Sequence, residues 1–303
     1  MIAKCSTTQK LDFLRDRQRS VEEEMKRYKH CIIVLIILTV STVIGCAGRT
    51  HVQKNNVVFQ TSTINALLKG IYDGDVSFGE LKSNGDFGLG TFNALDGEMI
   101  GLEGTFYQIK VDGVAYPVED SMKTPFAVVT FFAPDKTVML DTTNNYKQLK
   151  TYLDGLLPSQ NIFYAIKVEG KFKYIKTRSV PEQKKPYPPL LEVVKEQSIF
   201  EFQDIEGTIV GFRSPNYVQG MNVPGYHMHF ITKDRKAGGH LLECRIQDVK
   251  VEIDNINNFF MALPHGGEFY RVDLAQDKKK DLETVEKGTS RTGVEKLPIG
   301  GHP

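Results

Sequence analysis

Short apolar stretches separated by glycines and Asp-Gly pairs fill the chain between residues 83 and 118. Apolar and polar residues alternate within these stretches, which places the apolar residues on one face of a strand. Asp-Gly supplies the positive backbone angles that tight hairpin turns require. The pattern therefore predicts an antiparallel meander over residues 83–118, followed by a buried strand over Phe126–Phe132.

Four other segments show helical spacing or helix-ending residues. Ser62 or Thr63 is predicted to cap a short helix that ends at Gly74. Pro264 is expected to end a helix over Asp254–Leu263. The remaining two predicted helices are Tyr146–Leu156 and Leu190–Gln197.

Further strands are predicted on both sides of a proline-rich segment, residues 180–191. Glu169-Gly170 is interpreted as a two-residue hairpin turn between Ile162–Val168 and Lys171–Arg178. Later strands are expected at Glu206–Phe212, Tyr226–Thr232 and His240–Ile253.

The predicted fold class is α/β, a β-rich α+β arrangement of two tandem, similar mixed or antiparallel β-sheet domains with short flanking helices. Residues 97–102 echo residues 207–212, with acidic and aromatic neighbours at matching places, which favours two similar halves. The expected domains are 61–185 and 186–274. A polar tether is expected over 46–60 and a polar tail over 275–303.

The first 45 residues have the character of an export signal. Residues 31–45 (CIIVLIILTVSTVIG) carry no charge and follow a basic segment, which is the pattern of a signal peptide. The apolar run is short for a membrane-spanning helix, which needs about 20 apolar residues. The sequence Val43-Ile44-Gly45-Cys46 resembles the cleavage box of bacterial lipoproteins. This resemblance implies a diacylglycerol at Cys46 and an extracytoplasmic, lipid-anchored body. An uncleaved single-pass anchor stays open as the alternative.

Residues 1–24 are too acidic for the start of a signal peptide. Met25 begins a segment that is complete as a signal by itself. We interpret residues 1–24 as a wrongly assigned start.

The charge balance narrows the classes of partner. The chain has 38 Lys and Arg against 37 Asp and Glu, a net charge of +1, so it lacks the positive field of a nucleic-acid binder. Of four cysteines only Cys244 lies in the predicted body, which excludes a disulfide framework.

Three of the seven histidines gather in one predicted β-hairpin. His227 and His229 are two residues apart on a strand and share a face. Counting outwards from the turn at Asp234–Gly239 puts His240 opposite His229, with Cβ atoms roughly 5 Å apart. Three imidazoles on one face are typical of a catalytic metal site with open positions for substrate, and they suit zinc, iron or copper.

A histidine cluster of this kind also occurs in proteins of two other classes, which the residues alone leave open. A cupin-like non-haem metal oxygenase also carries His-x-His on a strand and a distant third histidine. A lipid-anchored binding module with a structural zinc ion would instead need a fourth tight protein ligand.

The chain from about Thr61 to about Lys287 resembles the bacterial alpha-acetolactate decarboxylases. The resemblance is carried by Ser83–Gly90 running into TFNALDGEM, by Lys176-Thr177-Arg178, by MNVPGYHMHF and by Gly238-Gly239-His240. It implies conversion of (S)-2-acetolactate to (R)-acetoin and CO2 in acetoin biosynthesis. The expected partners are this small molecule and the membrane, and a homodimer is the assembly considered.

The resemblance also implies the roles of individual residues. It assigns Zn2+ to His227, His229 and His240. It assigns catalytic roles to Arg178, Glu98, Glu286 and Thr91, with Glu98 and Glu286 as additional metal ligands. The resemblance further implies that the tail, residues 275–303, folds over the site. Glu283 lies one helical turn from Glu286 and is the alternative in the tail.

Overall fold

The computed structural model describes residues 56–142 and 144–287, together with residues 23, 25, 26 and 29. The predicted export signal, the predicted lipidation site at Cys46 and most of the predicted tether therefore lie outside the described residues. Within the described part, no helix is both long enough and apolar enough to cross a membrane. Both β-sheets belong to the compact unit that begins at Asn55.

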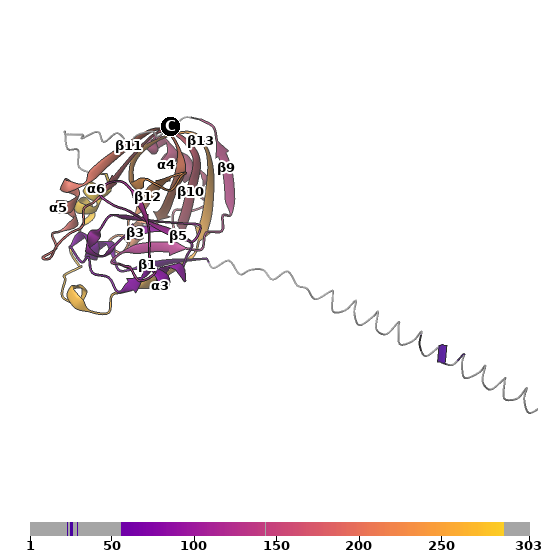
Figure 1. The fold of residues 1–303 in the computed structure, drawn as a ribbon, viewed down its shortest axis with the longest axis horizontal. Helices are drawn as coiled ribbons and strands as arrows, with labels where there is room; N and C mark the ends of the chain where they lie inside the picture. Colours follow the sequence, from indigo (N-terminus) through magenta and orange to yellow (C-terminus); the bar gives the residue numbers. More distant parts are fainter. Residues whose placement is uncertain (1–22, 24, 27–28, 30–55, 143, 288–303) are drawn as a thin grey trace, which may run out of the picture. The chain divides into compact units, whose positions relative to one another are not determined.

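A seven-stranded sheet forms the first layer, drawn at the lower part of the body in Figure 1. Its pairs are antiparallel except for the parallel pair of β1 and β14. In spatial order its strands are β14 (Asn258–Ala262), β1 (Val57–Thr61), β8 (Ala127–Thr130), β3 (Phe87–Thr91), β4 (Glu98–Leu102), β5 (Thr105–Ile109) and β6 (Ala115–Pro117).

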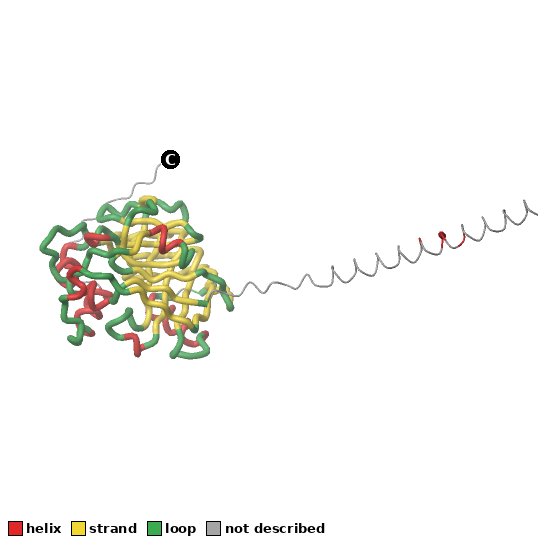
Figure 2. Tube along the Cα trace, turned by 90° about the horizontal axis from the view of Figure 1, so that it is seen from below, coloured by secondary structure: helices red, strands yellow, loops and turns green. Residues whose placement is uncertain are grey.

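The second sheet is built from long antiparallel strands and closes on itself. Its order is β10 (Phe163–Ser179), β11 (Ser198–Ser214), β12 (Gly225–Thr232), β13 (Gly238–Ile256) and β9 (Lys136–Leu140). Because β10 also pairs with β13, the first four strands form a ring. Figure 2 shows the strands of the body gathered in one block, with most of the helical segments at its margins.

Short helices cover the ends and edges of the sheets. The α-helices are α2 (Ile64–Leu68), α3 (Phe78–Lys82), α4 (Tyr146–Leu156), α5 (Leu190–Val193) and α6 (Lys279–Lys287). The 3-10 helices are η1 (Asn93–Leu95), η2 (Val194–Glu196), η3 (Asn216–Val218) and η4 (Gly267–Tyr270), and β2 (Val76–Ser77) pairs with β7 (Lys123–Thr124).

Apolar residues of both sheets share one core. Ile100 of β4, Val210 of β11 and Ile231 of β12 belong to the same buried cluster. A second cluster lies on the other side of the closed sheet and includes Leu149 and Leu153 of α4. Burial of these faces, at about 25 cal/mol per Å² of apolar surface, stabilises the packing of the sheets and orients β12 and β13.

The β-rich class is confirmed, and so are several elements predicted from the pattern. The meander over 83–118 is present as β3 to β6. Helix α4 has the predicted bounds, and Asn145 caps it in a reciprocal pair with Gln148. Thr63 is the cap of α2, although that helix ends at Leu68 because Gly70 takes a φ of +85°.

The predicted hairpin at Glu169-Gly170 is wrong. Residues 163–179 form one uninterrupted strand, β10, in which Gly170 has a φ of +148°. A Cβ atom on Gly170 would lie 2.3 Å from the carbonyl oxygen of Asp248 on β13. This glycine therefore permits close approach of two strands and does not form a turn.

The predicted helix over Asp254–Leu263 is also wrong. Its residues continue β13 and then form β14, which pairs in parallel with β1. Phe259 stacks on Phe163 with ring centroids 5.0 Å apart, and Phe260 stacks on Phe59 at 5.6 Å. Neighbouring phenylalanines can serve opposite faces only in a strand, where successive side chains alternate.

The expected tether and tail are partly regular structure. Residues 57–60 belong to β1, and residues 279–287 form α6. Both sheets draw strands from each side of residue 185, since β9 and β10 pair with β13 while β14 pairs with β1. The division into domains 61–185 and 186–274 stays a prediction. Strands from the two predicted domains pair with each other in both sheets.

Gly170→Ala should destabilise the protein by about 1–3 kcal/mol, because alanine combines a strained φ with a backbone clash. Gly155→Ala is the matched control, since Gly155 is exposed in α4 and a Cβ there meets nothing within 4 Å. That control should be neutral or stabilising by up to about 1 kcal/mol. Urea unfolding of both variants measures the difference, and equal stabilities would contradict the strain at Gly170.

Candidate active site

Three buried histidines meet on one face of the β12–β13 ribbon. His229 pairs with His240 in the strand register, as the counting from the turn predicts, and His227 shares their face. The three ring centroids are 5.1–5.2 Å apart, and one ligand nitrogen of each ring lies within 4.8 Å of the others. The cluster therefore presents three imidazole nitrogens to a single small volume.

The backbone selects the ring nitrogen that His229 turns toward the cluster. Its Nδ1–H donates to the carbonyl oxygen of Met99 on β4, at 2.8 Å. The opposite nitrogen, Nε2, then carries a lone pair, and it is buried without a hydrogen-bond partner. Nδ1 of His227 is likewise buried and unpartnered.

Burial keeps the three imidazoles neutral. Desolvation lowers the pKa of His229 to about 3 and holds the pKa values of His227 and His240 well below the usual range. The guanidinium of Arg178 acts in the same direction on all three rings. Unpartnered, neutral imidazole nitrogens within a few ångströms of one another fit a divalent transition-metal ion.

Arg178 extends the row of side chains onto a third strand. It lies on β10 opposite His240 on β13, so the pairing puts both side chains on one face. The residue is 4% exposed, and its Nε has no hydrogen-bond partner. A buried guanidinium with open donors fits a planar anionic group such as a carboxylate.

Glu98 enters the site from the other sheet. It begins β4, and its carboxylate lies 3.7 Å from both Arg178 Nη1 and His229 Nε2. Thr91 pairs with Glu98 across β3 and β4, and its hydroxyl donates to the carbonyl oxygen of Gly97 at 2.6 Å. Thr91 thus holds the turn that leads into Glu98.

This turn is strained and clamped. Ala94 and Leu95 have φ values of +60° and +54°, which cost non-glycine residues of order 1–3 kcal/mol. Ala94 N–H donates to Tyr72 O at 2.9 Å, and Gln183 N–H donates to Ala94 O at 2.7 Å. These bonds from distant segments fix where β4 begins and hence where Glu98 lies.

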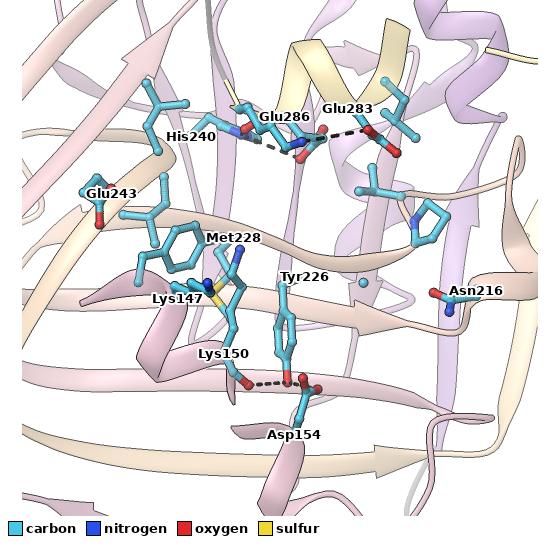
Figure 3. Close-up of a pocket in the computed structure, with 18 of the residues that line it drawn as sticks. Lys147, Lys150, Asp154, Asn216, Tyr226, Met228, His240, Glu243, Glu283 and Glu286 are labelled. Atoms are coloured by element: carbon cyan, nitrogen blue, oxygen red, sulfur yellow. Dashed lines mark hydrogen bonds and ion pairs between the residues drawn. The ribbon is translucent and has the colours of Figure 1, made fainter. Parts of the chain in front are cut away.

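Helix α6 brings a second carboxylate to the cluster. Leu282 and Val285 are buried in the shared core, which turns Glu286 toward His240 with an O···N distance of 3.7 Å. Glu283 faces Lys287 at 3.8 Å instead. The structure therefore places Glu286 beside the histidines and leaves Glu283 at the outer wall (Figure 3).

Burial raises the pKa of both carboxyl groups to about 7. Desolvation is the main cause for Glu98 and for Glu286, and Arg178 opposes it in each case. The mutual repulsion of the two carboxylates adds to the rise at Glu286. A bound cation would favour the charged form of each group.

Six of the residues assigned by resemblance, the three histidines with Arg178, Glu98 and Glu286, are thus gathered in one place, and Thr91 lies beside Glu98 in the strand register. Sequence reasoning missed the carbonyl of Met99 and the role of Gly239. At Gly239 φ is +142°, and a Cβ would lie 2.4 Å from Arg178 O. The Gly-Gly pair before His240 was the available signal for such a close approach.

A cavity of about 750 Å³ opens beside the cluster. His240 and Glu286 lie on its inner wall, and residues of α4, β12 and α6 form its other walls (Figure 3). Tyr226 links two of these walls, since its hydroxyl donates to Asp154 Oδ1 at 2.8 Å. The cavity therefore gives a small molecule access to His240 and Glu286, whereas His227, His229, Arg178 and Glu98 are not among the residues that line it.

Comparison with known proteins agrees with this geometry. Residues 58–276 match the family described as alpha-acetolactate decarboxylase. An alpha-acetolactate decarboxylase of Methanosarcina mazei is 52% identical over 233 residues, covering 77% of this chain and 81% of that protein. One of Methylococcus capsulatus is 50% identical over 250 residues, covering 79% and 96%.

The fold is shared as well. The crystal structure of alpha-acetolactate decarboxylase from Bacillus subtilis strain 168 superposes with a TM-score of 0.75 at 43% identity. The match covers 77% of this chain and all of that one.

Glu98→Gln should remove a pH-dependent instability of the metal-free protein. The pKa of Glu98 is about 7 in the folded state against an ordinary 4.5, so the unfolded chain releases this proton first as pH rises. Folding stability from this group is therefore lost between about pH 4.5 and pH 7, by roughly 3 kcal/mol in total. Glutamine stays neutral and lacks that loss.

Urea unfolding in the presence of a chelator, at pH 4.5 and pH 8, measures this effect. The variant should be more stable than the unsubstituted protein at pH 8 and similar to it at pH 4.5. Glu243→Gln, at an exposed position on the cavity wall, is the control and should change neither value. A gain of the same size at both pH values would contradict the burial effect.

Proposed function

The chain belongs to the alpha-acetolactate decarboxylase family and is a carboxy-lyase, and from this premise we propose that it converts (S)-2-acetolactate to (R)-acetoin and CO2 with a zinc ion held by His227, His229 and His240. One observation carries the proposal. Three neutral, buried imidazoles, two of them with an unpartnered ring nitrogen, lie together with a buried arginine and two carboxylates.

The substrate explains why such a set of residues is useful. Acetolactate has a ketone next to the carbon that carries its hydroxyl and carboxylate, so loss of CO2 moves an electron pair onto the ketone oxygen. A zinc ion, when bound, supplies a Lewis acid for that developing negative charge, worth several kcal/mol. No electron-accepting organic cofactor is required because the ketone is part of the substrate.

Arg178 is proposed to bind the substrate carboxylate. Its unpartnered Nε and its Nη1, near Glu98, provide the planar fork that a carboxylate can accept. Burial strengthens this interaction because little water competes for the same donors. Arg178 and the histidines lie in one cross-strand row, which fixes the orientation of the bond that breaks.

The product needs a proton delivered to one face of the carbon that loses CO2. Guanidinium hardly deprotonates, so Arg178 is proposed to hold the donor, either a water molecule or a carboxylic acid. Glu98, 3.7 Å from Arg178, and Glu286, beside His240, are the carboxyl groups within the site. They also orient substrate and serve as additional ligands of the ion.

The two alternatives that the residues alone leave open are a cupin-like oxygenase and a binding module with a structural zinc ion. Membership of a decarboxylase family favours a carboxy-lyase over both. Acetoin formation from acetolactate in the absence of oxygen separates the decarboxylase from the other two.

We further propose that the enzyme acts outside the cytoplasmic membrane, anchored through a lipid on Cys46. The support is the basic and apolar pattern of residues 26–46 and the sequence before Cys46. A homodimer is the assembly proposed, and mass measurement of the purified protein tests it.

His229→Ala should reduce zinc affinity at least a hundred-fold, because one of three ligands is lost. Acetoin formation should fall with the bound zinc, measured by elemental analysis and by chiral product analysis. His265→Ala is the control, since the side chain of His265 is 89% exposed and pairs with Asp75. Full zinc content and turnover in the His229 variant would refute the ligand assignment.

Glu286→Gln should lower turnover about 10- to 100-fold in a protein that stays folded, because the carboxylate beside His240 is lost while Leu282 and Val285 still hold α6. Glu283→Gln removes a carboxylate one helical turn away and should retain turnover within about two-fold. Steady-state kinetics of the pair measures this. Equal activities would show that α6 supplies no functional carboxylate.

A further inference from the structure

The cavity beside the histidine cluster is lined by more cations than the reaction centre itself uses. Its walls carry the side chains of Lys147, Lys150, Lys279 and Lys287. The walls also carry four carboxylates, those of Asp154, Glu243, Glu283 and Glu286. Lys147, Lys150 and Lys279 have no carboxylate within 4.0 Å among the described residues, and Lys150 is half-buried whereas the other two are exposed.

Three of the carboxylates have partners other than Lys150. Asp154 accepts from Tyr226, Glu283 lies 3.8 Å from Lys287, and Glu286 lies 3.7 Å from His240. Within the described chain, no carboxylate oxygen lies within 4.0 Å of the Lys150 ammonium. Its charge is therefore not neutralised by an ion pair.

Lys150 is also held in place. It is half-buried on α4, and its Nζ lies 4.2 Å from the centroid of the Tyr146 ring. Desolvation lowers the pKa of this ammonium, so an anionic ligand would relieve a real cost. Figure 3 shows its side chain rising from α4 into the cavity, on the side where His240 and Glu286 lie.

We propose that Lys150 forms a capture site for a small carboxylate anion in the outer cavity, where acetolactate binds before it reaches Arg178 and the histidines. The inference rests on the proposed function for the identity of the substrate. The ligand class is that of the proposed substrate, a small carboxylate anion, and it fits a half-buried ammonium without an ion pair in a cavity of this size. At about 30 Å³ per water molecule, a cavity of about 750 Å³ holds such an anion together with several waters.

The site acts on substrate capture and not on bond cleavage. An ammonium at the cavity wall raises the local concentration of anions, and salt screens it over about 10 Å. Removing its charge should therefore raise KM and leave kcat nearly unchanged. A residue that only packs against Tyr146 would show neither the KM effect nor its dependence on salt.

Lys150→Met tests the site because methionine keeps the apolar stem over the Tyr146 ring and removes the charge. In the full-length protein as purified, KM for acetolactate should rise about ten-fold and kcat should stay within about two-fold. The fall of kcat/KM with ionic strength should become shallower. Lys147→Met, an exposed cation three residues earlier on the same helix, is the control and should change KM by less than about two-fold.

A binding measurement separates this inference from the proposed reaction. Calorimetric titration with 2-hydroxyisobutyrate, a hydroxy acid without the ketone, should show about ten-fold weaker binding to the Lys150→Met variant. If neither protein made acetoin but this difference persisted, the capture site would stand and the proposed reaction would fall. Equal Kd and KM for the variant and the unsubstituted protein would overturn the capture site.

Lys150→Arg retains the positive charge and should keep KM within about three-fold. A loss as large as that of Lys150→Met would show that charge is not the cause. An equal loss in Lys147→Met would also overturn the proposal, because it would make net charge, and not this position, responsible.

Discussion

The rest of the site depends on one constraint, the desolvation of three imidazoles on the β12–β13 ribbon of the closed second sheet. Buried rings stay neutral, and neutral nitrogens without protein partners are costly unless a ligand satisfies them. The cross-strand row of His229, His240 and Arg178 exists only because β10 pairs with β13 and closes the second sheet. Strand pairing, and not any loop, therefore sets the distances among these groups.

The first sheet completes the site through two adjacent residues at the start of β4. On β4, the carbonyl of Met99 selects the tautomer of His229, and the preceding residue of the same strand, Glu98, supplies a carboxylate. A strained turn at Ala94 and Leu95, clamped from Tyr72 and Gln183, determines where this strand begins. Strain at this position is consistent with a segment that is held for function at some expense of stability.

The C-terminal helix gives the site its outer wall. Leu282 and Val285 anchor α6 in the core, so Glu286 is held by packing although its own sequence surroundings are polar. The same helix and α4 form walls of the cavity that opens beside His240 and Glu286. Access, the position of the second carboxylate and the proposed capture by Lys150 are thus consequences of one packing arrangement.

The sequence by itself determined the local elements and the pairing of His229 with His240, because both follow from side-chain periodicity and turn chemistry. Resemblance supplied Glu98, Arg178, Glu286 and Thr91, whose separate positions carry no local signal. Only the tertiary structure decided that Gly170 lies inside a strand and that residues 258–262 form β14, since long-range pairing overrode the local preference for a turn and a helix. It also decided that Glu286 and not Glu283 meets His240, because burial of Leu282 and Val285 fixes the rotation of α6.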